Sequence, residues 1–198
     1  MRRLWLIDAS YIFATSQQLY GRGNYVDYLL LRKLVEERFG ALWRGYYLNG
    51  VNAGGNEGRD RFHNWLQTAR PGGPQLIVKL YGLKSEAVTA AYCVECETKV
   101  AVSCPHGSHH QLHNQRQKGV DVGLATTALL HKERFDALVL TSGDGDLAEV
   151  VEHLSEQGKR IELAVFSQGV SSDLQARADD FLWIDHHEEA VHYGAVGA

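Results

Sequence analysis

Apolar runs alternate with amphipathic stretches along most of the chain. Short apolar runs, of which 4–7 is the first, predict buried strands, and stretches with apolar residues at helical intervals predict helices between them. Strands are predicted at 4–7, 43–50, 75–82, 136–142, 160–167 and 181–185, and helices within 25–39 and at 57–69, 120–132, 147–158 and 172–179. Near-continuous apolar strands that alternate with helices are typical of a mainly parallel sheet covered on both faces, so the sequence predicts an α/β fold.

One segment interrupts this alternation. Residues 82–117 contain all three cysteines together with a cluster of histidines, and they look like an insert within the domain. The last residues, 186–198, are small and polar, which predicts a flexible C-terminal tail. A chain of 198 residues with 44% hydrophobic residues suits one domain with a buried core, which we place at 1–185.

Charge and hydropathy limit the classes of function. The net charge of −4 argues against a protein that holds nucleic acid by a broad positive surface. No apolar run approaches the length of a membrane span, and the apolar run after Arg2 and Arg3 is too short for a signal peptide. We therefore expect a cytoplasmic protein with no membrane partner.

Four aspartates are predicted to meet at one edge of the sheet. Asp8 ends the first strand, and Asp144 and Asp146 follow the strand 136–142. Functional groups collect at the carboxyl ends of parallel strands. Asp121 opens the helix 120–132, which runs antiparallel to the strand that follows it, so its N-terminus lies at the same edge.

Each aspartate also has a purely structural interpretation. Asp8 suits a turn, and Asp121 or Asp146 suits a helix N-cap. Taken together, four acids in motifs whose only lysine or arginine is Lys118 favour a divalent cation with hard oxygen ligands, magnesium or manganese. Such sites suit phosphodiester hydrolysis by metal-activated water.

Three stretches, "LIDASYIF", "KGVDVGLATTAL" and "LTSGDGDLAEVVEHLSEQGKRIELA", resemble in this order the NYN domain family, the LabA-like branch of the PIN-like nucleases. The closing "SDLQARADDFLWID" resembles the last helix and strand of the family. The resemblance covers nearly the whole chain apart from the insert and the tail. It implies a PIN-like, three-layer α/β/α sandwich and a metal-dependent ribonuclease whose acidic residues fall on Asp8, Asp121, Asp144 and Asp146, with Ser142 supporting the metal shell.

The chain departs from the family pattern at two positions. Tyr11 stands where the family commonly has asparagine, and Thr127 stands where it often has a further aspartate. Tyr11 has two interpretations, a core aromatic residue, which we favour, and a base-stacking surface at the mouth of the crevice. Both departures are expected to weaken a metal site without abolishing it.

The insert has the ligand spacing of a small structural zinc site. Cys93-x2-Cys96 lets two thiolates reach one ion, and Cys104 with His106 completes a tetrahedral set. His109 or His110 could replace His106. The alternative interpretation is three reduced cysteines beside a cluster of surface histidines.

Both ends of the insert are predicted to lie beside the acidic crevice, because it leaves a strand end and returns at the helix that carries Asp121. We expect it to form one wall of the substrate path. Arg116 and Lys118, at its exit, are candidates for gripping the RNA backbone.

The sequence therefore predicts an endoribonuclease, a hydrolase that cleaves RNA with a magnesium or manganese ion. One rival is a non-catalytic RNA-binding or scaffold module, which the two departures and the negative charge favour. Another is a metal phosphohydrolase for a small molecule, because Gly-Asp-Gly-Asp after a strand also suits that chemistry. A homodimer or another protein partner stays open at this point.

Overall fold

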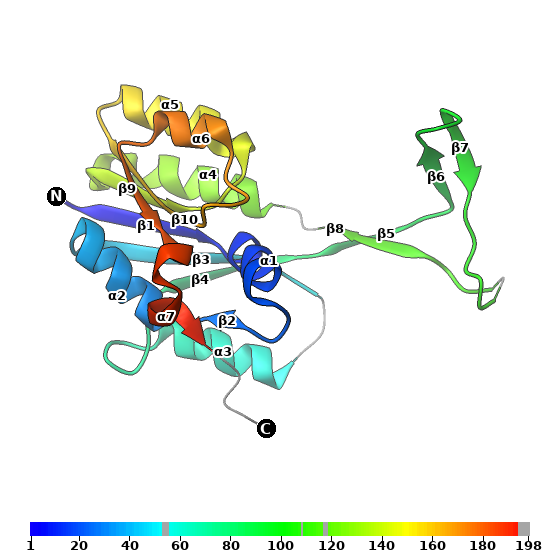
Figure 1. The fold of residues 1–198 in the computed structure, drawn as a ribbon, viewed down its shortest axis with the longest axis horizontal. Coiled ribbons are helices and arrows are strands. Elements are labelled where there is room, and N and C mark those ends of the chain that lie inside the picture. Colours follow the sequence, from blue (N-terminus) through cyan, green and yellow to red (C-terminus); the bar gives the residue numbers. More distant parts are fainter. Residues whose placement is uncertain (53–55, 108, 117–118, 194–198) are drawn as a thin grey trace.

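The computed structural model describes residues 1–52, 56–107, 109–116 and 119–193, and its centre is a six-stranded sheet (Figure 1). The strand order is β11-β10-β9-β1-β3-β4, and every neighbouring pair is parallel. The strands are β1 (Arg3–Asp8), β3 (Leu42–Val51), β4 (Ile77–Gly82), β9 (Ala137–Thr141), β10 (Arg160–Val165) and β11 (Asp180–Trp183). All six coincide with strands predicted from apolar runs.

Helices cover both faces of the sheet, which confirms the predicted α/β sandwich (Figure 1). One face carries α4 (Val120–His131), α5 (Ala148–Glu156) and α6 (Ser172–Arg177). The other carries α1 (Ala9–Tyr20), α2 (Tyr28–Phe39), α3 (Glu57–Gln67) and α7 (Glu188–Val191). Short 3-10 turns η1 (Lys132–Arg134), η2 (Gly145–Leu147) and η3 (Ile184–His187) join them. None of the helices in the described residues is both long and apolar enough to cross a membrane.

Successive side chains along each strand point to opposite faces of the sheet, and this divides the core into two apolar clusters. In β1, Leu4 and Leu6 face the cluster under α4 and α5, while Trp5 and Ile7 face the cluster under α1 and α2. All four side chains are almost completely buried. Because both faces of β1 are covered, the strand reads as one continuous apolar run.

The C-terminal end contains more regular structure than the flexible tail predicted for 186–198. Residues 188–193 form α7 and the short strand β12 (His192–Tyr193). β12 pairs antiparallel with β2 (Tyr25–Val26), a strand that was not predicted. These backbone hydrogen bonds extend the ordered domain beyond its predicted end at 185, and 194–198 lie outside the described residues.

The predicted insert forms a long two-part ribbon, and we call its described residues from 84 to 116 the arm. β5 (Lys84–Ala87) pairs with β8 (His113–Arg116), and β6 (Ala90–Cys93) pairs with β7 (Thr98–Ala101). The arm leaves the end of β4 and projects away from the body along the longest axis of the molecule (Figure 1). Its tip therefore does not form the predicted wall of the acidic crevice, and only its base adjoins the sheet.

Candidate functional site

Asp8 lies at the junction of β1 and α1 and is held on both sides of its carboxylate. Its Oδ1 accepts hydrogen bonds from the backbone N–H groups of Ser10 (2.9 Å) and Tyr11 (3.2 Å), which caps α1. The Ser142 hydroxyl donates to Oδ2 at 3.4 Å. β1 and β9 are parallel neighbours, so the ends of these two strands bring Asp8 and Ser142 together although 134 residues separate them. Asp8 is only 6% exposed.

The loop after β9 positions the next two carboxylates. The backbone N–H of Asp144 donates to Ser142 Oγ at 3.3 Å, and the N–H of Asp146 donates to Asp144 Oδ1 at 3.0 Å. Asp144 therefore caps η2, and the N-cap position of α5 is Leu147 without a side-chain hydrogen bond. The N-cap interpretation of Asp146 is wrong, because Asp146 lies inside η2.

Asp121 lies in the first turn of α4 and is not its cap either. The N-cap is Gly119, with a left-handed φ of 90° and no side-chain hydrogen bond. The first turn of α4 sits directly on Tyr81 of β4: a Cβ at Gly119 would lie 3.2 Å from the Tyr81 ring, and one at Gly123 would lie 2.1 Å from its hydroxyl oxygen. This close packing fixes the helix end that carries the exposed Asp121 side chain.

The carboxylates interact electrostatically. Burial raises the pKa of Asp8, and the charge of Asp121 raises it further, against the hydrogen bonds that lower it. Partial burial raises the pKa of Asp121, and the charges of Asp144 and Asp146 add to this effect. Asp121 thus lies within electrostatic reach of the acids on both strand ends.

The carboxylate oxygens of these aspartates are hard donors, the type of ligand that magnesium and manganese prefer. In the described part of the chain, no three Asp, Glu, His or Cys side chains converge into a closed metal-binding group. Magnesium does not require one, because it is usually bound through one or two carboxylates and completes its octahedron with water and substrate phosphates. An ion held here would therefore keep positions for water and for substrate phosphates.

Neutralising Asp121 should stabilise the metal-free protein. A carboxyl group whose pKa is raised in the folded state contributes stability below its unfolded pKa, and this contribution is lost as the pH rises through the folded pKa. In EDTA at pH 7, Asp121→Asn is expected to raise the unfolding midpoint by about 1–3 °C, with no difference at pH 4 or below. Thermal unfolding from pH 4 to 8 measures this, and Glu133→Gln, at the opposite end of α4, is the control for net charge. If Asp121→Asn instead lowered the unfolding midpoint at pH 7, the charge repulsion between Asp121 and the neighbouring aspartates would be contradicted.

The two residues that depart from the family pattern are structural. The hydroxyl oxygen of Tyr11 accepts a hydrogen bond from the Phe166 N–H at 3.0 Å, and its ring packs on Phe166 with centroids 5.9 Å apart. This agrees with the core interpretation of Tyr11 rather than the stacking one. Thr127 is buried and donates to the Gly123 carbonyl, while it accepts a hydrogen bond from Lys79 Nζ at 2.8 Å.

The basic residues predicted at the exit of the insert are only partly described. Lys118 lies outside the described residues, and for Arg116 the backbone alone is described. Arg116 pairs with Lys84 across β5 and β8, which places two basic residues opposite each other at the base of the arm.

The arm does not assemble the predicted zinc site. Cys93 ends β6 and Cys96 lies in the turn of the β6–β7 hairpin, while Cys104 Sγ lies 3.4 Å from His110 Nδ1. These are two separate pairs, and no three ligands meet among the described residues, which include His106 and His109. All three cysteines are free thiols. The zinc prediction is therefore wrong for the described residues, because its ligands form two pairs that do not meet, and His110 rather than His106 contacts Cys104.

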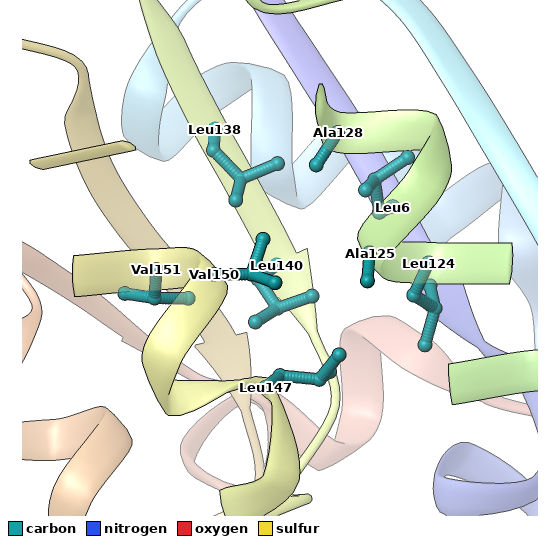
Figure 2. Close-up of a pocket in the computed structure, with 9 residues that line it drawn as sticks. All are labelled: Leu6, Leu124, Ala125, Ala128, Leu138, Leu140, Leu147, Val150 and Val151. Atoms are coloured by element: carbon teal, nitrogen blue, oxygen red, sulfur yellow. The ribbon is translucent and has the colours of Figure 1, made fainter. Parts of the chain in front are cut away.

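A small apolar gap lies between the elements that carry the acids. A gap of about 10 Å³ lies between α4, α5, β1 and β9, and only apolar side chains line it, among them Leu6, Leu124, Leu140 and Leu147 (Figure 2). This volume is at most that of one water molecule. None of the four acids lines this gap, so it is not their substrate site.

Gly143 is a site residue that the sequence did not single out. A Cβ on this residue would lie 1.7 Å from the carbonyl oxygen of Gly169, and its own carbonyl accepts a hydrogen bond from the Ser171 N–H at 3.0 Å. The glycine between Ser142 and Asp144 suggests only a turn, and nothing in the sequence signals its contact with Gly169.

Comparison with known proteins agrees with this architecture. The family model described as "NYN domain" matches residues 4–185. A crystal structure of a protein of unknown function, VPA0982 from Vibrio parahaemolyticus RIMD 2210633, superposes with a TM-score of 0.63 at 20% sequence identity, covering 97% of this chain and 96% of that chain. At this identity the similarity shows the fold alone. No curated protein matches the chain.

Proposed function

The chain belongs to the NYN domain family, whose members are generally PIN-like nucleases that act on RNA, and from this premise we propose that it is a metal-dependent endoribonuclease. The observation that carries the proposal is the electrostatic coupling of Asp121 with Asp8 on one side and with Asp144 and Asp146 on the other. Neighbouring negative charges raise the pKa of Asp8 and of Asp121, and such a group of carboxylates at an open edge favours a divalent cation between them.

Each residue has a defined part in this proposal. Asp8, Asp121, Asp144 and Asp146 would hold magnesium or manganese, which when bound activates water and neutralises charge on the phosphate. Ser142 orients the site, because its hydroxyl group donates to Asp8 and accepts from the Asp144 N–H. No protein nucleophile takes part.

Metal removal tests the proposed activity. The purified protein, incubated with mixed cellular RNA and manganese or magnesium, is expected to produce internal cuts, and EDTA is expected to reduce the rate by at least about 100-fold. Gel electrophoresis of the products measures both rates. RNA retention without metal-dependent cleavage would instead support the non-catalytic binding module.

The small-molecule phosphohydrolase is the weaker alternative. Its substrate would need an enclosing pocket with polar groups, whereas the gap of about 10 Å³ beside α4 and α5 is lined only by apolar side chains. Turnover of p-nitrophenyl phosphate in the same manganese buffer, without RNA cleavage, would favour it.

We also propose how RNA is held and where the protein acts. The base of the arm, with Lys84 opposite Arg116, is our candidate for contact with the RNA backbone, and Lys118 keeps its predicted role there. The cytoplasm is the proposed location. A homodimer remains a proposal that light scattering can test.

A further inference from the structure

Two aromatic rings stand on the surface near the start of α1. Phe13 is 55% exposed and Tyr25 is 51% exposed. Their rings stack on each other, with centroids 6.3 Å apart and planes inclined by 28°. Phe13 comes from α1 and Tyr25 from β2, so two separate elements contribute to one exposed aromatic pair. Exposed apolar side chains that lie against each other in a patch mark binding sites more often than single exposed ones do.

The turn between α1 and β2 holds the pair in place. Gln17 Oε1 accepts a hydrogen bond from the Gly23 N–H at 3.0 Å, and Gln17 Nε2 donates to the Asn24 carbonyl. The Asn24 side chain donates to the Tyr20 carbonyl. Gly23 has a left-handed φ of 90°, a backbone conformation that glycine adopts without steric cost and that this turn requires. Tyr25 is therefore fixed beside Phe13 before any ligand binds.

The pair lies close to the acidic edge along α1. Asp8 caps this helix, and Phe13 follows five positions later, which is about 7–8 Å along the helix axis at 1.5 Å per residue. The sheet-facing side of α1 carries the buried Ile12 and Ser16, so Phe13 points away from the core. This rise of about 7–8 Å along the helix axis is on the scale of a few bonds of a nucleic-acid backbone.

We propose that Phe13 and Tyr25 form a stacking platform for an unpaired base of the RNA substrate, with the exposed Arg22 in the same turn contacting its phosphate. This inference rests on the proposed function, because it assigns the substrate contact of the same site. Phosphates are repelled by a chain of net charge −4 and by the carboxylates of the centre, so affinity needs a contribution that is not Coulombic. Stacking on aromatic rings provides it for any base.

The experiment uses single-stranded RNA of mixed sequence that carries one 2-aminopurine, with an abasic strand of equal length for comparison. In EDTA the wild type is expected to quench the 2-aminopurine fluorescence on binding and to bind the abasic strand more weakly. Phe13→Ala is expected to abolish the quench and to raise Kd for the normal strand by about 5- to 100-fold. Phe13→Trp should restore both, and Leu130→Ala, which truncates a side chain 77% exposed on α4, is the matched control.

The outcomes separate the platform from the nuclease proposal. If Phe13→Ala and Tyr25→Ala bind and quench like the wild type while RNA is still cut, the platform is wrong and the nuclease stands. If they change only the oligomeric state in light scattering, the pair is a contact between copies of the chain and the platform is equally wrong. Metal-dependent cleavage that persists in Phe13→Ala with a higher KM and an unchanged kcat supports both proposals.

Discussion

Asp144→Asn is expected to reduce RNA cleavage by at least about 100-fold while the protein stays folded. Even residues that only support a metal ligand cost about 10- to 100-fold when they are replaced, so loss of a proposed ligand should cost more. The fold should survive because asparagine keeps the oxygen that accepts the Asp146 N–H and so keeps η2 capped. Initial cleavage rates in manganese and the unfolding midpoint measure the two effects.

A matched control variant separates the effect of losing the carboxylate at Asp144 from the effect of changing the net charge. Glu133→Gln also removes one negative charge, but it lies in η1, at the far end of α4 from Asp121. It should cut RNA at the wild-type rate. Raising the manganese concentration should partly restore Asp144→Asn, because the loss lies mainly in metal affinity. Equal cleavage by Asp144→Asn and wild type would show that the reaction does not take place at this centre.

The strands could be predicted because both of their faces are buried. β9 is a nearly continuous apolar run, and in β10 only Glu162 interrupts the apolar residues after Arg160, so both strands have the pattern of a covered parallel sheet. The position of the acids followed from the same logic, since the carboxyl ends of parallel strands share one edge. Asp8 and Ser142 meet for this reason alone.

Helix α1 escaped prediction because its sequence is a weak helix signal. "ASYIFATSQQLY" contains serine, threonine, isoleucine, phenylalanine and tyrosine, all with only modest helix propensity. Its exposed Phe13 breaks the apolar periodicity, since that ring contacts Tyr25 rather than the core. The helix forms because Asp8 caps it locally and because Ile12 packs into the core, and the second of these is a tertiary effect.

The arm shows the opposite failure. The spacing of Cys93, Cys96 and Cys104 predicted a single zinc centre, but spacing does not specify how two hairpins are joined. The register of β6 and β7 pairs Cys93 with Thr98 across the turn and leaves Cys104 beyond the strand, where it contacts His110. The spacing therefore predicted a convergence of side chains that the described residues do not show.

Gly143→Ala is expected to destabilise the protein by about 2–4 kcal/mol and to remove most of the activity. The added Cβ would lie 1.7 Å from the backbone carbonyl oxygen of Gly169 and 2.6 Å from the Tyr11 ring. Gly143 does not have a left-handed φ, so the cost is purely steric. A backbone atom cannot rotate away as a side chain can, so the loop that carries Ser142 and Asp144 must move.

Two further glycines make this prediction specific. At Gly82 a Cβ would meet nothing within 4 Å, so Gly82→Ala should change stability by less than about 0.5 kcal/mol. At Gly145 a Cβ would lie 3.0 Å from Ser171 Oγ, which can shift, so Gly145→Ala should fall between the other two. Urea unfolding ranks the three variants by their free energy of unfolding. Cleavage rates, measured at a temperature where all three are folded, show whether displacement of the loop alone lowers activity. A shift of about 1 Å in a catalytic group can lower the rate by about 100-fold. Equal stability of Gly143→Ala and Gly82→Ala would mean that the loop after β9 does not pack against Gly169, and the placement of Asp144 would fail with it.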